Sequence, residues 1–383
     1  MIRGRMGALA ALAAAGLMAM SLGAAEAAPR QSGKAHGAQA ASADATGSIR
    51  QQGERLNQNT VAIVSGNPNG TYLQVAYDLS AVLDDADRLR VLPVVGKGGA
   101  QNIRDVLFLK GVDMGIAQST DLTRLKRELP GEAGKLVYLT KLYNEEVHVL
   151  ARGEIRTLKD LEGKAVNFSD IGGGTQFVAR ELFEKSGVNV REVNMGQADA
   201  IEKMRNGEVS ATVFVAGKPG TAFAKAPRDI GLHFLPVRYG AEFEESYYPA
   251  ALEAADYPGL IGPGERVETI AVGAVLIAFN WPAKTDRYRR LETFVEAFFS
   301  KFDGFQAAPR HPKWREVNLA TDVPGWRRFE PARRWLAERS AAPSGDEAAL
   351  KSEFDRFAAG KNLSAEARER MFEEFLRWRE KGR

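Results

Sequence analysis

The sequence predicts an α/β fold made of two parallel-sheet domains. Short apolar strands are each followed by a glycine-containing loop and an amphipathic helix, and this unit recurs in two sets, at residues 60–118 and 164–215. Strands that alternate with helices form parallel sheets, because a parallel crossover needs a helix-length connection. The chain has 383 residues, 44% of them hydrophobic, which is enough for two domains with cores of their own. Such sheets bind ligands at the carboxyl ends of their strands.

Residues 1–27 have the pattern of a secretory signal peptide. Arg3 and Arg5 precede a run of small apolar residues, and an Ala-Glu-Ala cleavage site ends at Ala27. A retained membrane anchor is the alternative. Residues 28–58 are rich in Ala, Ser, Gly and Gln without an apolar period, so we expect a flexible linker there. Cleavage of the signal peptide would place the protein in the periplasm.

The first β/α set begins with a β-branched strand at Thr60–Val64. A short loop with two glycines leads into a helix, and Thr71 and Gln74 at its start have the spacing of a capping box. Tyr72 belongs to the apolar face of this helix. The loop and the helix start are therefore expected beside the carboxyl end of the strand.

Two further strands complete the first set. Val91–Val95 is followed by a loop with three glycines at residues 96–99 and then by a helix that ends before Gly111. The strand Val112–Ala117 delivers Gln118 and Ser119 at its carboxyl end. These polar residues are expected at the same edge of the sheet as the first loop.

The connection between the two sets is strongly β-forming. We expect strands at Leu136–Leu142 and Val147–Ala151, interrupted by the polar residues 144–146. A long apolar run at Glu268–Phe279 is placed to return the chain to the first domain. Two crossings of this kind would form a hinge between lobes.

The second set opens with the strand Lys164–Phe168, followed by Gly172–Gly174 and a helix that ends before Gly187. Glycines permit close backbone approach, and we expect Thr175 to cap the helix. Free N–H groups at the helix start favour an anionic oxygen, so the loop predicts an anion pocket. A loop that serves only the geometry of the fold is the alternative. The set continues with strands at Arg191–Met195 and Val209–Val215.

The carboxyl-terminal third is expected to be helical in pieces. Leu291–Phe302 has helical apolar spacing, and prolines divide the region that follows. We expect a helical extension at residues 311–383, with an amphipathic helix at Ser364–Lys381 that packs on the body. Three tyrosines precede this region and are expected to pack between a lobe and the return strand, with a lid over the ligand as the alternative; they are Tyr247, Tyr248 and Tyr257.

Composition argues against several classes of protein. The net charge of +3 is small for this length, so no nucleic-acid partner is expected. There is no cysteine, which excludes disulfides and thiol nucleophiles. The histidines are scattered and no G-x-S-x-G motif occurs, so no metal site, cofactor or catalytic residue is expected. Asp170 as a base is a weaker alternative to a turn-capping role. His148 is expected to be a core or hinge histidine.

An ordered set of motifs resembles a known family. The motifs are Asn69–Tyr72, Gln101–Asn102, Gly111–Asp113 with Gln118, Glu146–Val149, Leu158–Lys164, Gly172–Thr175, Gly217–Pro219 and Thr269–Val272. In this order they resemble a TAXI-type solute receptor of the TRAP transporters, a branch of the type II periplasmic binding proteins. The resemblance covers about residues 61–281.

The resemblance implies a two-lobed type II periplasmic-binding-protein fold with hinge strands. Lobe 1 would comprise residues 59–150 with 268–310, and lobe 2 residues 151–267. The implied ligand contacts are Asn69, Thr71, Tyr72, Asn102, Gln118 and Ser119 in lobe 1, and Gly173, Gly174, Thr175, Gln176, Gly217 and Pro219 in lobe 2. Lys97 and Lys218 in rim loops are further candidates to pair with a ligand carboxylate, or are simply solvated.

The resemblance also implies a function. The protein would capture a small carboxylate-bearing solute, such as a glutamate-like amino acid or a dicarboxylate, and deliver it to the membrane subunits of a TRAP transporter. We expect a monomer and no catalytic activity. A ligand-sensing receptor for a membrane signalling protein is the first alternative, and a small-molecule enzyme on the same fold is the second.

Overall fold

A computed structural model describes residues 35–85, 88–224, 226, 231–341, 354 and 372. The chain divides into two units, residues 1–51 and 52–383. Helix α1 extends over Ala35–Gln58, so the described part of the expected flexible linker is helical instead. The expected signal peptide lies outside the described residues. Within the described part of the chain, no helix has both the length and the apolar composition of a membrane span.

In the second unit, the described residues form one sheet of ten strands. Its order is β2-β1-β3-β10-β4-β7-β5-β6, with β8 paired to β4 and β9 paired to β10. The strands are β1 (Thr60–Val64), β2 (Arg90–Val94), β3 (Met114–Gln118), β4 (Leu136–Ala151), β5 (Ala165–Asn167), β6 (Arg191–Val193), β7 (Ala211–Ala216), β8 (His233–Phe234), β9 (Tyr248–Glu253) and β10 (Arg266–Phe279).

Helices follow most of these strands, as the repeated unit predicted. The α-helices are α2 (Thr71–Leu83), α3 (Gly99–Phe108), α4 (Ser119–Glu128), α5 (Pro130–Ala133), α6 (Gly174–Lys185), α7 (Gln197–Arg205), α8 (Thr221–Ala224), α9 (Asp286–Ser300) and α10 (Glu330–Ala341). Short 3-10 helices lie at η1 (Leu158–Leu161), η2 (Phe302–Phe305) and η3 (Pro312–Glu316).

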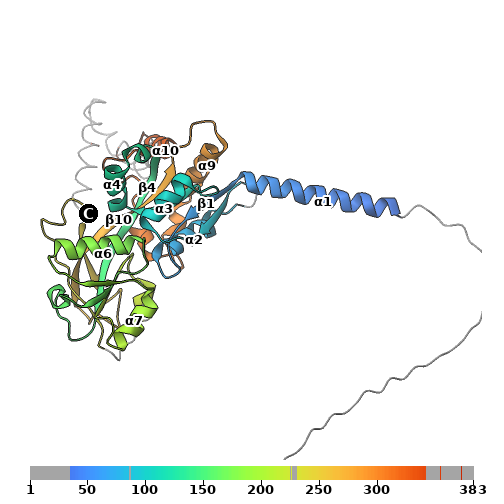
Figure 1. Ribbon diagram of the computed structural model, residues 1–383. Helices are drawn as coiled ribbons and strands as arrows, with labels where there is room; N and C mark the ends of the chain where they lie inside the picture. Colours follow the sequence, from blue (N-terminus) through green and yellow to red (C-terminus); the bar gives the residue numbers. More distant parts are fainter. Residues whose placement is uncertain are drawn as a thin grey trace, which may run out of the picture. The chain divides into compact units, whose positions relative to one another are not determined.

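Strands β4 and β10 are long and join two lobes. In the first lobe, β1 pairs in parallel with β2 and β3. In the second lobe, β5 pairs in parallel with β6 and β7. Strands β4 and β10 lie between these two sets. Figure 1 shows α2, α3 and α4 around one part of the two strands and α6 and α7 around the other. The predicted two-lobed α/β fold with hinge strands is therefore confirmed. The two predicted parallel sheets are instead joined into one mixed sheet, because β10 and β4 pair antiparallel between them.

The expected interruption of β4 is wrong. Residues 144–146 continue the strand, because Asn144, Glu145 and Glu146 pair in register with Gly273, Val272 and Ala271 of β10. Pairing along β10 thus overrides the low strand propensity of asparagine and glutamate. As a result, the side chains of Glu145 and Glu146 project from the middle of the sheet at the point where the lobes join.

In the first lobe, both faces of the sheet are covered. Apolar side chains of β1 and β3 alternate, so that Ile63 and Ile116 contact α2 and α9, whereas Val64 and Ala117 contact α3 and α4. Burial on both faces explains why these strands are continuously apolar instead of alternating.

The second lobe repeats this layering. Val213 and Val215 on β7 pack with α6, whereas Phe214 packs on the other face with Met204 of α7. Stacked rings of Phe168 and Phe183, with centroids 5.5 Å apart, tie the loop after β5 to the body of α6. The glycine loop is therefore anchored at both ends.

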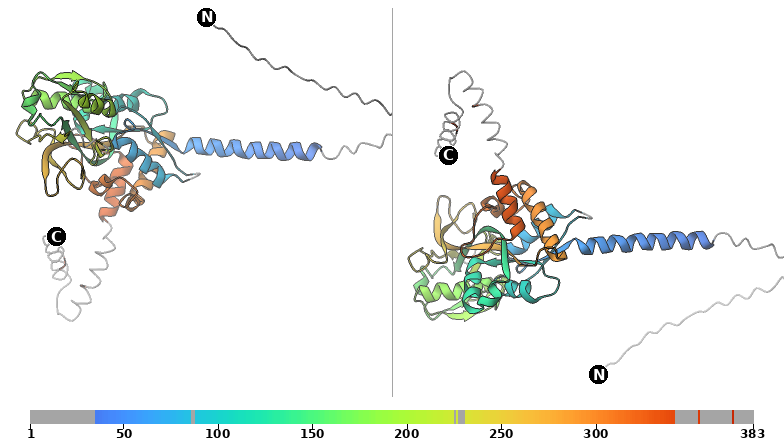
Figure 2. Two further views of the ribbon diagram at one scale, coloured as in Figure 1. Left: turned by 90° about the horizontal axis from the view of Figure 1, so that it is seen from below. Right: turned by 90° about the horizontal axis from the view of Figure 1, so that it is seen from above.

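The segment after α9 belongs to the core of the first lobe. Trp314 of η3 and Phe329 are almost fully buried in the same apolar cluster as α2 and α9. Helices α9 and α10 lie side by side (Figure 2). The described part of the predicted helical extension thus packs against lobe 1, and the amphipathic helix predicted at residues 364–381 lies outside the described residues apart from Phe372.

Candidate functional site

The loops that follow the parallel strands of both lobes meet around one cavity. The first lobe contributes the loops after β1 and β2 and the end of β3, and the second lobe contributes the loop after β5. Glu145 of β4 and Phe214 and Val215 of β7 complete the wall. The cavity lies at the carboxyl ends of parallel strands, which is where such sheets bind ligands.

Part of the predicted contact set lines this cavity. These residues are Thr71, Tyr72, Gln118, Gly173, Gly174 and Thr175. The other predicted contacts do not line it as the lobes stand in this structure; they are Asn69, Asn102, Ser119, Gln176, Gly217 and Pro219. Lys97 also lines the cavity, and its side chain is exposed at the mouth.

Asn102 and Gln176 use their side chains to hold the loops in place. Nδ2 of Asn102 donates to the carbonyl oxygens of Ser65, at 2.5 Å, and Ile116, at 2.7 Å. Nε2 of Gln176 donates to Oε1 of Glu192 at 2.6 Å. Both amides therefore shape the cavity from behind its wall.

The predicted helix caps of Thr71 and Thr175 are wrong. Glycines 70 and 173 occupy the cap positions of α2 and α6, and neither helix has a side-chain cap. The hydroxyl of Thr71 instead donates to the carbonyl oxygen of Gly217, at 3.1 Å, and the hydroxyl of Thr175 accepts from the backbone N–H of Val215. Tertiary partners compete successfully with the local capping bond, which contributes only about 1 kcal/mol.

Helices α2, α3, α4 and α6 all begin at the cavity without a side-chain cap. Three of their cap residues are glycines, which leave the first turn of backbone N–H groups unobstructed. The positive ends of these helix dipoles therefore lie at the cavity, so its wall favours negative charge.

The cavity is closed by direct contact between the lobes. An added Cβ on Gly99 would lie 2.8 Å from Cα of Gly174, and one on Gly174 would lie 2.7 Å from Oε1 of Gln118. Only glycine allows the two loops to approach this closely. The remaining volume is about 40 Å³, room for about three water molecules. A solute of amino-acid size therefore requires the lobes to separate.

Among the described residues, three hydrogen bonds bridge the lobes around the cavity. Besides the bond from Thr71 to Gly217, Nδ2 of Asn67 donates to Oδ2 of Asp170 at 3.2 Å, and the hydroxyl of Thr221 donates to the carbonyl oxygen of Asn69 at 3.0 Å. The two bonds to carbonyl oxygens contribute about 0.5–1.5 kcal/mol each in net terms, and the bond to Asp170 contributes at most about 3 kcal/mol. Closure of this kind is reversible at small cost.

Glu145 is the buried ionisable residue of the cavity wall that the predicted contacts did not include. Its carboxyl group is buried at the cavity, where Oε2 accepts from the hydroxyl of Tyr72 at 2.5 Å and from Nε2 of Gln118 at 3.4 Å. Burial raises the pKa of Glu145 to about 8, although the hydrogen bonds from Tyr72 and Gln118 oppose the rise. The available signal was a pair of adjacent glutamates within a stretch of sixteen residues that is mostly strand-forming.

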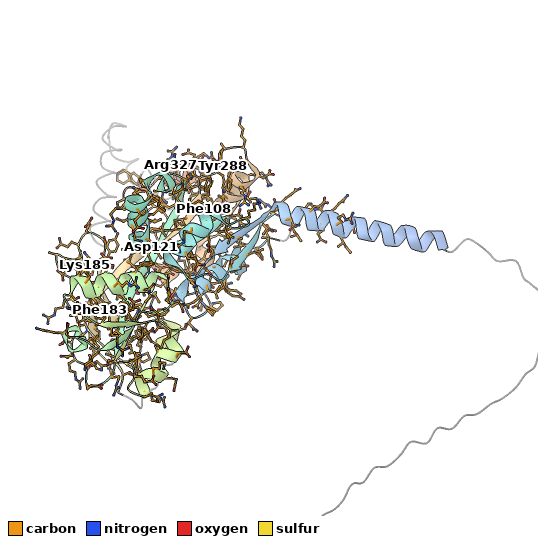
Figure 3. All side chains as sticks on the ribbon, in the orientation of Figure 1. Phe108, Asp121, Phe183, Lys185, Tyr288 and Arg327 are labelled. Atoms are coloured by element: carbon orange, nitrogen blue, oxygen red, sulfur yellow. The ribbon has the colours of Figure 1, made fainter. Side chains whose placement is uncertain are left out.

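Two further buried oxygens near Glu145 lack a partner among the described residues: Oε1 of Gln118 and Oδ2 of Asp121. Oδ1 of Asp121 accepts from Arg124 at 2.9 Å. Burial raises the pKa of Asp121 to about 6, and Arg124 opposes the rise. Asp121, labelled in Figure 3, lies close to the first residue of α6, because Gly99 lies against both Oδ2 of Asp121 and Cα of Gly174.

Glu146 lies on the opposite face of β4 and is paired within the chain. Its Oε1 accepts from the buried ammonium of Lys313 at 2.6 Å, and its Oε2 accepts from the backbone N–H of Lys218 at 3.1 Å. Burial still raises the pKa of Glu146, with the Lys313 ammonium opposing it. The Lys218 ammonium, predicted as a candidate ligand contact, instead pairs with Asp256 at 2.9 Å.

His148 is a satisfied core histidine, as predicted. Nδ1 lies 3.1 Å from the carbonyl oxygen of Phe214, and Nε2 lies 2.7 Å from the hydroxyl of Tyr257. The preferred interpretation of the tyrosines is confirmed for Tyr247 and Tyr257, which are buried in the core of the second lobe. Among the described residues, no group of three or more His, Asp or Glu side chains is placed to hold a metal ion.

Two β/α lobes joined by two long strands, with a cavity between them, define the type II periplasmic-binding-protein fold. The chain belongs to the NMT1-like family, whose model matches residues 63–318.

Similarity to solved structures is low. The periplasmic binding protein BugD shares 14% identity over 73% of this chain and 93% of its own length, with a TM-score of 0.45. The periplasmic aliphatic sulphonate binding protein SsuA from Escherichia coli shares 16% identity over 80% and 88%, with a TM-score of 0.39. The methionine binding protein MetQ shares 13% identity over 65% and 94%, with a TM-score of 0.38. The fold is therefore assigned from the sheet topology and the family.

Proposed function

We propose that this protein is a periplasmic solute receptor, exported by a cleaved signal peptide. It captures a small carboxylate-bearing solute, a glutamate-like amino acid or a dicarboxylate, between its lobes and delivers it to the membrane subunits of a TRAP transporter. The observation that carries this proposal is the convergence of uncapped helix starts from both lobes on one cavity.

The helix starts and Lys97 supply the carboxylate site. Backbone N–H groups at a helix start donate to anionic oxygens, and the dipole adds about 0.3–1 kcal/mol for each charge. The Lys97 ammonium at the mouth adds a solvated cation, and it forms no ion pair with the described residues. The proposed contacts are the predicted residues that line the cavity, namely Thr71, Tyr72, Gln118, Gly173, Gly174 and Thr175.

Capture would depend on the hinge. Strands β4 and β10 are the continuous connections along which the two lobes can rotate, and the bridging hydrogen bonds are few and weak. An opened cleft would admit the solute, and closure would surround it with the loops of both lobes. We propose a monomer that binds without turnover.

The proposal predicts that a carboxylate-bearing solute raises the melting temperature of the protein. A ligand present at about 100 times its dissociation constant adds about 2.7 kcal/mol to the free energy of unfolding. The measurement is a thermal-shift screen against amino acids, dicarboxylates, keto acids and sugars, followed by calorimetric titration. Lys97→Met should weaken binding of any carboxylate that shifts the protein, whereas Lys159→Met, at an exposed lysine away from the cavity, should not. A shift with sugars alone would contradict the carboxylate assignment.

A signalling receptor is the second candidate, since the same lobes could close on a ligand and present a surface to a membrane sensor. Transport is tested by reconstituting candidate TRAP membrane subunits in vesicles and measuring uptake of the identified solute. Uptake that requires this protein supports the transport role. Solute-dependent binding to a sensor protein without uptake supports signalling instead.

A further inference from the structure

The helix starts at the cavity offer hydrogen-bond donors, whereas another part of its wall offers acceptor oxygens. Two side chains that line the cavity present acceptor oxygens, Glu145 and Gln118. Gln118 is 3% exposed and lines the cavity, yet its Oε1 has no hydrogen-bond partner among the described residues. A buried acceptor without a donor is unfavourable by about 1–3 kcal/mol. The arrangement therefore calls for a donor that the described chain does not supply.

Glu145 has only neutral donors. The hydroxyl of Tyr72 and the amide of Gln118 both reach Oε2, and no lysine or arginine of the described residues pairs with this carboxyl group. Both bonds go to the same oxygen, and Glu145 is one of the residues that line the cavity. A buried carboxylate is stable as an anion only beside a cation. The missing cation can come from the ligand.

We propose that the ligand of this cleft carries a cationic nitrogen, which binds between Glu145 and Oε1 of Gln118. This inference rests on the proposed function, because it concerns the same cleft. The nitrogen would lie at the deep end beside β4, and a carboxylate would lie at the helix starts. An α-amino acid satisfies both ends, whereas a dicarboxylate places a second anion against Glu145. The ligand class therefore narrows from the two alternatives to amino acids and other aminated solutes.

The first experiment is a binding panel that varies the two groups independently. Amino acids carry both groups, keto acids and dicarboxylates carry only the carboxylate, amines such as putrescine carry only the nitrogen, and sugars carry neither. Matched members share a carbon skeleton: glutamate, 2-oxoglutarate and glutarate form one such series. Full-length protein is screened by thermal shift, and each binder is then titrated by calorimetry.

The second experiment uses variants of the acceptor. Removal of one partner from a buried charge pair weakens binding by at least about thirtyfold, so Glu145→Gln should do so for an aminated ligand. Glu268→Gln makes the same chemical change at an exposed glutamate of β10 outside the cavity and should leave binding unchanged. Circular dichroism and melting of both variants establish that they are folded.

The outcomes separate this inference from the proposed function. The inference is supported if only nitrogen-bearing solutes bind and if Glu145→Gln weakens their binding. If only amines without a carboxylate bind, the carboxylate assignment of the proposed function fails while the inference stands. Binding of 2-oxoglutarate or glutarate as tight as that of glutamate, undiminished in Glu145→Gln, overturns the inference and keeps the proposed function. In that case, protonated Glu145 donates a hydrogen bond to a ligand carboxylate. The amide of the Glu145→Gln variant can donate the same bond, which explains the undiminished binding. Binding of sugars alone, or of no solute in the panel, counts against both.

Discussion

Glu145 and Glu146 are neighbours on one strand, and both are buried, yet they have different partners. Glu146 pairs with the ammonium of Lys313 and accepts from the backbone of Lys218. Glu145 faces the cavity and accepts only from the neutral groups of Tyr72 and Gln118. Alternation along the strand sends the two carboxyl groups to opposite faces.

The difference separates a structural charge from a functional one. The chain compensates the charge of Glu146 internally, which fixes the segment that carries Lys313 onto the hinge strand. It supplies no cation for Glu145, so burial raises the pKa of that carboxyl to about 8 and the group holds its proton at neutral pH. A buried group whose pKa is displaced in a cleft is a candidate for ligand recognition.

The largest expected effect concerns the compensated charge. Lys313→Met should lower the free energy of unfolding by about 3 kcal/mol, because it leaves Glu146 buried without its cation. Urea denaturation measures the change. The double variant Lys313→Met with Glu146→Gln should recover much of the loss, since the uncompensated charge is gone. Equal instability of the single and double variants would show that packing of Lys313, and not the ion pair, matters.

The next effect concerns the pH dependence of stability. The pKa of Glu145 is raised in the folded chain, so its contribution is present in full at low pH and is lost as the pH rises toward about 8. Burial lowers the pKa of His148 and His311 to about 4. These two groups make the free energy of unfolding rise with pH, but only below their ordinary pKa of 6.5. The window from pH 6.5 to 8 therefore isolates the carboxyl groups.

In that window, Glu145 should lower the free energy of unfolding by about 2 kcal/mol, at about 1.4 kcal/mol per pH unit. The contribution of Glu145 is measured by urea denaturation of the natural protein and of Glu145→Gln at both ends of the window. Glu146 is present in both proteins, so its contribution cancels in the comparison. Parallel pH profiles for the two proteins would mean that Glu145 does not hold a proton in the folded state.

A third effect concerns the pH dependence of binding. If an ammonium binds beside Glu145, the carboxyl must lose its proton, so affinity should rise about tenfold, or about 1.4 kcal/mol, from pH 6 to pH 7. The groups around Glu145 that also influence this step are Tyr72, Tyr143, Asp121 and Glu146. Calorimetry at pH 7 in buffers of different ionisation enthalpy should detect release of about 0.9 proton per ligand. Uptake of a proton, or none exchanged, would contradict ionisation of Glu145.

The smallest effect concerns the hydroxyl of Tyr72. Tyr72→Phe removes one donor from Glu145 and should lower the free energy of unfolding by about 1 kcal/mol. It should also raise the pKa of Glu145 further, because the bond from Tyr72 lowers it. Tyr77→Phe, on the exposed side of the same helix, serves as the matched control. A pH profile unchanged by Tyr72→Phe would show that this bond does not tune Glu145.

Local sequence patterns predicted the order of strands, loops and helices well. The strand at Thr60–Val64 and the glycine loop at Gly172–Gly174 were recognisable because apolar runs and glycines encode local geometry. The partners of Asn102, Thr71 and Thr175 were not predictable, since they are set by segments far away in the chain. The uninterrupted β4 and the burial of Glu145 depend likewise on pairing with β10, which no local pattern records.

The contact between Gly99 and Gly174 has a consequence for rates. A cavity that holds only about three water molecules cannot admit a solute, so each binding event has to wait for separation of the lobes. The observed association rate should then rise with solute concentration only up to a plateau equal to the opening rate of the free protein. Stopped-flow mixing reads this plateau directly, and Gly99→Ala, which forces the loops apart, should raise it.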